Sequence, residues 1–301
     1  MKINKSFLSL FAISLLATSA SAQIFYKIEG NGLEKPSYLF GTHHMAPISI
    51  IETYNLPQYM DETEQVVGEI DLTQDPMAIG MAMQSHMLAP ADSTLSKVIP
   101  PEDYLIIDEE FKKWAPIPGA DLTMFEPLKP MVVTTTVTAG IMSKQIPDYD
   151  PQNQLDTYFM KKGQQDGKKI TGLETPEFQA SVLFDITPIS VQAEDLVEML
   201  KEPQKLVDSS KKLNDAYMSA NLDKMMELTE DEDSNSEFMI AILDKRNAEW
   251  LTKLPDIMAD APAFIAVGAL HLAGDKGLVE GLRKLGYTVS PVEVAVALPA
   301  E

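Results

Sequence analysis

The clearest fold signal lies in residues 264–289, which read FIAVGALHLAGDKGLVEGLRKLGYTV. Its apolar start predicts a strand over Phe264–Val267, and Gly268 lets the backbone leave that strand sharply. Leucines spaced by four and three residues then predict a helix, which a glycine ends before a second strand begins. This order is typical of a βαβ unit, in which sites lie beyond the carboxyl ends of the strands. His271, three residues after Gly268, therefore stands where a site is expected.

The same pattern occurs near the N-terminus of the chain. The apolar run Tyr38–Phe40 meets Gly41, and His44 follows three residues later. The chain holds only four histidines, and a pair of imidazoles suits a divalent transition metal. We expect His44 to join His271, because its neighbour His43 lacks the matching spacing and points the opposite way on an extended segment.

Strand signals lie mainly near the two ends of the chain, and the middle is mostly helical. The sequence therefore predicts an α/β fold, with a mixed β-sheet of early and late strands and a large helical insertion at about 75–260. Thr175 and Pro176 are suited to cap and open one of the helices. We expect a single domain over residues 23–301, with no second hydrophobic core separated by a linker. The expected strands cover residues 24–28, 37–40, 65–72, 168–174, 264–267 and 287–294.

Residues 1–22 have the features of a secretory signal peptide. A positively charged start precedes an apolar run, and Ala20-Ser21-Ala22 forms a small-residue cleavage site. No later segment reaches the roughly 18 apolar residues that a transmembrane helix needs. We therefore expect an exported protein, periplasmic or secreted, without membrane insertion once the signal is removed.

The composition excludes several classes of function. A formal net charge of −21 repels phosphate backbones and anionic headgroups, so nucleic acid and membrane surfaces are not expected partners. The same charge attracts metal ions and basic peptides. Because the chain has no cysteine, disulfides and thiol catalysis are excluded.

Two acidic residues alternate with apolar ones along the predicted strand over residues 65–72. Glu69 and Asp71 are therefore expected to share one face of that strand. Carboxylates in such a place are costly unless they are solvated, paired or bound to a metal. Either the segment is an edge strand whose acidic face is solvated, or Glu69 joins the two histidines as a metal ligand or general base.

Arg246 lies in the middle of an apolar stripe on a predicted helix. A buried guanidinium keeps its proton and requires a carboxylate in bidentate contact. Glu174 and Glu69 are the candidate partners. The alternative is a side chain whose stem lies along the core while its head reaches water.

A methionine-rich segment at residues 77–87 surrounds His86. Thioethers with an imidazole can hold Cu(I), and export makes copper handling conceivable. Methionine also fills gaps in cores, so packing or an apolar substrate groove is the favoured interpretation.

Several of these motifs together resemble the TraB/PrgY/GumN family, which is related to the Tiki proteases and to the erythromycin esterase and ChaN-like fold. The resemblance spans nearly the whole mature chain and implies an α/β domain with a helical insertion. It rests on Tyr38-Leu39-Phe40-Gly41-Thr42-His43-His44, Val67-Gly68-Glu69-Ile70-Asp71-Leu72, Gly172-Leu173-Glu174-Thr175, Arg246-Asn247 and Val267-Gly268-Ala269-Leu270-His271.

The resemblance also implies a chemistry. Tiki relatives are proteases that depend on Mn²⁺ or Co²⁺ and cut a short segment from the N-terminus of secreted signalling proteins. Their functional set of two G-x-x-H motifs and a glutamate falls here on His44, His271 and Glu69. Glu174 and Arg246 match two further positions of the family pattern. Other branches dampen peptide pheromone signals, by sequestration or by hydrolysis.

The leading hypothesis is an exported metal-dependent hydrolase, a peptidase acting on a peptide or secreted protein. His44, His271 and Glu69 would hold Mn²⁺ or Co²⁺, with Zn²⁺ as a further candidate, and Glu69, Arg246 and Glu174 would serve catalysis. One alternative is a metal-free esterase-like hydrolase with a histidine base, although the chain has no G-x-S-x-G elbow. The other is a non-catalytic protein that binds a peptide, haem or copper.

Overall fold

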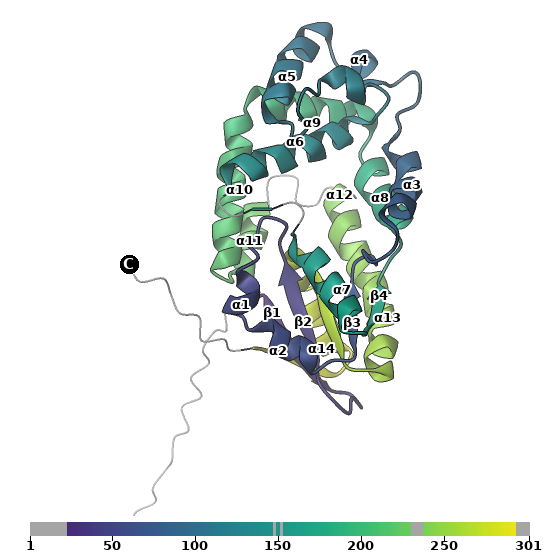
Figure 1. Ribbon diagram of the computed structural model, residues 1–301, viewed down its shortest axis with the longest axis vertical. Coiled ribbons are helices and arrows are strands. Elements are labelled where there is room, and N and C mark those ends of the chain that lie inside the picture. Colours follow the sequence, from purple (N-terminus) through teal and green to yellow (C-terminus); the bar gives the residue numbers. More distant parts are fainter. Residues whose placement is uncertain (1–22, 147–148, 151–152, 230–236, 293–301) are drawn as a thin grey trace, which may run out of the picture.

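The central sheet of the computed structural model has six strands in the order β4-β3-β5-β2-β1-β6 (Figure 1). The structure describes residues 23–146, 149–150, 153–229 and 237–292, so the predicted signal peptide lies outside the described residues. Early strands β1, β2 and β3 and late strands β5 and β6 share this mixed sheet with β4 from the middle of the chain, which confirms the α/β prediction. The strands are β1 (Phe25–Gly30), β2 (Ser37–Thr42), β3 (Gln65–Gly68), β4 (Lys169–Gly172), β5 (Ala263–Gly268) and β6 (Tyr287–Pro291).

The register of the parallel strands brings their carboxyl ends to one edge of the sheet. β5 pairs in parallel with β2 and β3, and β3 pairs in parallel with β4. Gly68 is opposite Ala266 on one side and Gly172 on the other, while Thr42 is opposite Gly268. The segments that leave β2, β3, β4 and β5 therefore start side by side.

The end of the chain forms the predicted crossover. Helix α14 (Leu278–Lys284) connects β5 to β6, which is antiparallel to β1 and so runs in the direction of β5. Gly286 ends the helix with a φ of +95°, a left-handed backbone that favours glycine.

Helices connect and surround the strands. Thr175 caps α8 as predicted, because its side chain accepts a hydrogen bond from the backbone N–H of Phe178. None of the described helices is long and apolar enough to cross a bilayer. Besides α14, the elements are α1 (Ile50–Thr53), α2 (Leu56–Asp61), α3 (Pro76–Met87), α4 (Leu95–Val98), α5 (Pro101–Trp114), η1 (Leu122–Phe125), α6 (Pro130–Gln145), α7 (Leu155–Gln165), α8 (Pro176–Asp185), α9 (Ile189–Lys201), α10 (Pro203–Met218), α11 (Leu222–Thr229), α12 (Glu237–Met239), the π-helix η2 (Ile240–Lys245), α13 (Arg246–Asp260) and η3 (Ala269–Leu272).

The described residues form two large hydrophobic clusters, and the single domain expected over residues 23–301 stays a prediction. The first cluster surrounds the sheet and includes side chains of α7, α13 and α14. The second, which we call the helical lobe, is built from α4, α5, η1, α6, α8, α9 and the start of α10. In Figure 1 helices α4, α5, α6 and α9 gather at the end of the molecule opposite the sheet. Helix α10 joins the clusters, with Val207 in the lobe and Tyr217 in the sheet core.

The prediction that Glu69 and Asp71 share a strand face is wrong, because β3 already ends at Gly68. Asp71 lies in a turn, where its side chain accepts hydrogen bonds from the backbone N–H and the hydroxyl of Thr73. Gly172 packs against this turn, and a Cβ there would lie 2.8 Å from the amide nitrogen of Asp71. Glu69 therefore follows β3 instead of belonging to it, and it lies at the edge of the sheet where the parallel strands end.

The methionine-rich helix α3 has no buried residue. Met77 and Met81 are 72% and 69% exposed, so core packing is wrong for these two side chains. Met83 and Met87 do pack against the helical lobe.

Candidate functional site

A cavity of about 470 Å³ lies at the carboxyl ends of β2, β3 and β5. Its polar floor comes from the strand ends and includes all three predicted ligands, His44, Glu69 and His271. Such a position is the usual place for a site in an open parallel sheet. Its walls are largely apolar and come from α7, α8, α10, α11 and η2, with Met160, Val182, Leu183, Leu213, Met225 and Ile242 among the side chains.

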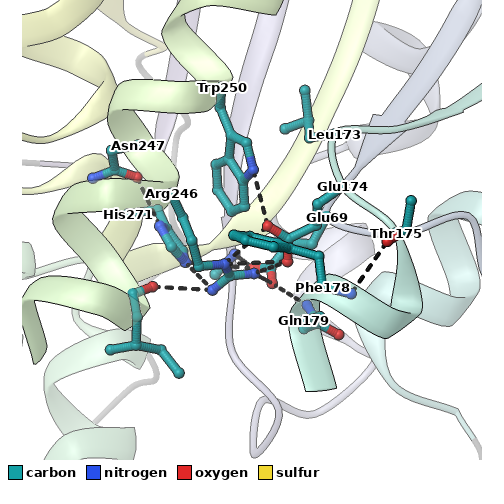
Figure 2. Close-up of polar contacts among 12 residues, drawn as sticks. Glu69, Leu173, Glu174, Thr175, Phe178, Gln179, Arg246, Asn247, Trp250 and His271 are labelled. Carbon is teal, nitrogen blue, oxygen red and sulfur yellow. Dashed lines mark hydrogen bonds and ion pairs between the residues drawn. The ribbon is translucent and has the colours of Figure 1, made fainter. Parts of the chain in front are cut away.

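Arg246 is the centre of the buried polar network beneath this floor (Figure 2). It is 4% exposed and makes a bidentate contact with Glu174, through Nε at 3.1 Å and Nη2 at 2.6 Å. Nη2 also donates to Glu69 at 2.6 Å, while Nη1 donates to the carbonyl of Ile242 and to Nε2 of His271, both at 3.0 Å. Both predicted carboxylate partners are therefore confirmed, and the alternative with a solvated head is wrong. Because a guanidinium has five N–H donors and all are used, Arg246 positions its neighbours and has none left for a substrate.

Glu69 is the part of this network that reaches solvent, with a side chain 21% exposed. Oε1 accepts from the backbone N–H of Gly268 at 2.9 Å, and Oε2 accepts from Gln179 at 2.9 Å in addition to Arg246. Burial alone would raise the pKa of Glu69, but the charges of His271 and Arg246 and the Gly268 N–H outweigh it and lower the pKa to about 2. The carboxylate is therefore a fixed negative charge at neutral pH.

His271 is buried, and both of its ring nitrogens are occupied. Nδ1 lies 2.7 Å from Oδ1 of Asn247, so it carries the proton, and Nε2 accepts from Arg246. The ring lies 4.4 Å from that of Trp250, whose indole N–H donates to Glu174 at 3.2 Å. Burial lowers the pKa of His271 to about 4, against the opposing effect of Glu69. At neutral pH the imidazole is uncharged, so Arg246 and the Gly268 N–H hold the Glu69 carboxylate.

His44 has the opposite surroundings. Its side chain is 77% exposed, and its Nδ1 lies 3.5 Å from Oδ2 of Asp156, at the start of α7. The hydroxyl of Thr42 donates to the other oxygen of Asp156 at 2.7 Å. The pKa of His44 is raised, chiefly by Asp156 with a further contribution from Glu69. The structure thus places one histidine where it gains a proton easily and the other where it does not.

His43 also lines the cavity, so the expectation that it points away is wrong. Residues 43–46 form a turn, in which the N–H of Ala46 donates to the carbonyl of His43, and side chains of a turn do not alternate. The His43 ring lies 5.0 Å from that of Tyr217, and no described residue forms a hydrogen bond with its buried Nε2. Burial lowers its pKa to about 4.

The two glycine–histidine turns are in direct contact. A Cβ on Gly41 would lie 2.9 Å from the Cα of Ala269, within the second turn. One on Gly268 would lie 3.3 Å from Oε1 of Glu69. Neither glycine has a positive φ, so close approach, rather than a sharp left-handed exit from the strand, requires glycine at both positions.

Sequence reasoning missed three side chains that complete the floor. Asp156, Gln179 and Asn247 lie on three different helices and orient His44, Glu69 and His271 respectively. A polar residue on a helix has no distinguishing pattern, and the only available signal was the position of Asn247 directly after Arg246.

The donor set does not fit a metal ion in this arrangement. Among residues 23–146, 149–150, 153–229 and 237–292, no group of three histidine, aspartate or glutamate side chains is placed to hold one. Nε2 of His271 already accepts from Arg246, and Nδ1 of His44 faces Asp156. The ion that the resemblance implies stays a prediction, and we derive no step through it.

His86 does not line the cavity. Its Nδ1 lies 2.5 Å from Asp185, whose carboxylate also pairs with Lys129. This ion pair accounts for the histidine without a metal.

Comparison with known proteins confirms the resemblance. The sequence model described as the TraB/PrgY/gumN family matches residues 24–291. No curated protein and no solved structure matches the chain.

Proposed function

The chain belongs to the TraB/PrgY/gumN family, and on that premise we propose that the cavity at the ends of β2, β3 and β5 is the active site of a hydrolase for peptide-like substrates. The observation that carries the proposal is the pairing of exposed His44 with Asp156 beside the ionised Glu69 in one cavity. Titratable groups with pKa values driven apart in a shared cleft are typical of acid–base sites.

His44 is the proton-transfer group of this proposal. With Nδ1 directed at Asp156, Nε2 is the nitrogen that takes a proton from an attacking water. Asp156 stabilises the resulting imidazolium, which then returns the proton to the leaving amine. A raised pKa suits this role, because a base works best when its pKa is near the pH of the reaction.

The buried network positions the rest of the floor. Arg246 and Glu174 neutralise one another and fix Glu69, and His271 fixes Nη1 of Arg246. Glu69 in turn raises the pKa of His44. Glu174, Arg246 and His271 therefore act through Glu69 and are positioning residues, whereas His44 and Glu69 face the substrate.

The walls support a peptide-like substrate. Apolar side chains from five helices surround a polar floor, which suits a chain of alternating amide groups and side chains. We propose export to the periplasm or outside the cell on the features of residues 1–22, which would give the site access to secreted peptides and proteins.

Hydrolysis of a quenched-fluorescence peptide collection, with products identified by mass spectrometry, tests the proposal. We expect His44→Gln to lower kcat by at least about 100-fold, since general base catalysis contributes that much or more. The matched control is His86→Gln, which changes a histidine outside the cavity and should leave kcat within about twofold. Equal turnover by the wild type and His44→Gln contradicts the proposal. Binding without any turnover favours the sequestering alternative.

A second candidate is the metal-dependent form of this hydrolase, with Mn²⁺, Co²⁺ or Zn²⁺ held by His44, Glu69 and His271. One observation favours it: Asn247 keeps the proton of His271 on Nδ1, as in many metal sites, so the Nε2 lone pair would bind an ion if the hydrogen bond from Arg246 gave way. Exhaustive chelation separates the two candidates. Activity that survives chelation supports the metal-free form, and a stoichiometric ion that both His44→Ala and His271→Ala lose supports the metal-dependent form.

A further inference from the structure

The charges of the cavity point to the kind of group that a substrate brings to its floor. We propose that the cavity binds a primary ammonium group, which a peptide presents as its free N-terminus or as a lysine side chain. This inference rests on the proposed function, because it names a substrate class for the same cavity.

The floor offers almost no cationic donor to a ligand. All five N–H groups of Arg246 have acceptors within the protein. Both ring nitrogens of His271 are engaged within the protein, Nδ1 with Asn247 and Nε2 with Arg246. A carboxylate or phosphate placed against Glu69 would therefore find no free donor in the Arg246 network, which disfavours anionic groups at that point of the floor.

Negative charge exceeds positive charge at the floor. The guanidinium of Arg246 stands against the carboxylates of Glu69, Glu174 and Asp156. His44 offsets one further charge only when it is protonated. Oδ2 of Asp156 is buried and has no hydrogen-bond partner within the described part of the chain, and the imidazole of His44 lies 3.5 Å from it.

Glu69 supplies the point of contact. It is the carboxylate of the Arg246 network that reaches solvent, and among the described residues its Oε1 accepts one hydrogen bond, from Gly268 at 2.9 Å. Each carboxylate oxygen accepts two, so one acceptor position stays open there. Oε2 is already filled by Arg246 and Gln179.

One open position favours a compact cation over a planar one. A guanidinium binds a carboxylate best through two parallel bonds, which the filled Oε2 denies it. An ammonium group is a point charge whose donors rotate freely, so a single acceptor serves it. The apolar walls, including Val182 and Ile242, suit the carbon atoms next to such a group.

Equilibrium binding of four peptides to the full chain tests the proposal, at pH 7 in the presence of a chelator. The first is an apolar pentapeptide of alanine and leucine with a free N-terminus, and the second is the same peptide acetylated. The third is acetylated with one internal lysine, and the fourth has norleucine in place of that lysine. We expect the first peptide or the third to bind about 10–100-fold tighter than its uncharged partner, the effect of one charge-assisted hydrogen bond. Which pair differs identifies the source of the ammonium group.

Equal affinities within both pairs, including no binding by any peptide, overturn the proposal. The wild-type comparison needs no variant, so a loss of folding cannot obscure it. Glu69→Gln should abolish the preference for the charged peptide, whereas Glu64→Gln, which removes an exposed acid paired with Lys35, should preserve it. Preference in binding without hydrolysis would overturn only the proposed function, and hydrolysis without preference would overturn only this inference.

Discussion

His44 and His271 each follow a glycine at the end of a parallel strand by three residues, yet their imidazoles lie in opposite surroundings. His44 is 77% exposed beside Asp156, whereas His271 is buried between Arg246 and Asn247. The pKa of the first is raised and that of the second is lowered to about 4.

The comparison shows that the spacing of glycine and histidine sets where each turn lies, whereas the surrounding side chains set the protonation of each imidazole. The shared G-x-x-H spacing brings both turns to one edge of the sheet, where Gly41 packs directly against Ala269. The protonation of each ring depends on side chains from other elements, namely Asp156 on α7 and Arg246 on α13. Two turns of the same sequence pattern therefore place one imidazole where it is exposed beside a carboxylate and the other where it is buried in a hydrogen-bonded network.

The largest expected effect comes from removing the guanidinium of Arg246, which binds His271 in the second glycine–histidine turn. Arg246→Met leaves Glu174, with a side chain 3% exposed, buried without its counter-charge. We expect the free energy of unfolding to fall by about 3–5 kcal/mol, as for other broken buried pairs. Urea denaturation measures the change. Lys276→Met, which removes an exposed cation paired with Asp244, is the control and should cost less than about 1 kcal/mol. A loss for Arg246→Met as small as that of the control would mean that Glu174 is not buried as described.

Acid should destabilise the protein through the buried histidines. The unfolded chain takes up the His271 proton near its ordinary pKa of 6.5, whereas the folded protein resists until the pH reaches about 4. The stability from neutral His271 is therefore complete above pH 6.5 and is lost as the pH falls toward 4, by roughly 3 kcal/mol. His43, with a pKa of about 4, adds to the loss in the same window.

Urea midpoints measured between pH 7.5 and 4.5 check this dependence. His271→Gln should flatten the profile without abolishing it, because His43 still contributes. His44 has the opposite sign: its raised pKa gives stability at low pH that is lost as the pH rises through the folded pKa. A profile that is unchanged by His271→Gln would contradict the neutral, buried state of this ring.

Alanine substitution of each histidine compares the contributions of the two rings to stability at a fixed pH. At pH 7.5, His271→Ala removes a buried ring and takes away the partner of Oδ1 of Asn247 and of one N–H of Arg246, which should cost about 2–4 kcal/mol. His44→Ala removes an exposed ring and should change the stability by no more than about 0.5 kcal/mol. Thermal unfolding of the two variants side by side gives the difference, and equal losses would refute the assigned roles.

The contact between the turns predicts the smallest effect. Gly41→Ala would place a Cβ 2.9 Å from the backbone of Ala269, so we expect a loss of about 1–3 kcal/mol from overpacking. Gly80→Ala is the matched control, since nothing lies within 4 Å of a Cβ there and alanine favours its helix, α3. Gly41→Ala as stable as the wild type would show that the two turns do not touch.

Much of this arrangement was predictable from local pattern. Apolar runs and turn residues located the strands, and Thr175 marked a helix start, because these signals depend on neighbours in sequence. A guanidinium on the apolar face of a helix requires a carboxylate partner, so the sequence predicts Glu174 and Glu69 as partners of Arg246, and the structure shows both ion pairs.

The remainder depends on contacts between distant segments. Polar residues such as Asp156 and Gln179 on solvated helices carry no mark of the side chain that they meet. The helical lobe forms its own core because α5, α6 and α9 pack on one another, which no single helix pattern reveals. The end of β3 at Gly68 follows from the turn that packs on Gly172, and the alternating sequence concealed it.

The most direct measurement is the pH titration of the histidine side chains by NMR, with each resonance assigned through single His→Gln variants. The account predicts that His44 titrates above the ordinary value of 6.5, while His271 stays neutral until the pH approaches 4. Titration of both rings together near pH 6.5 would contradict it, because the two turns would then share one environment.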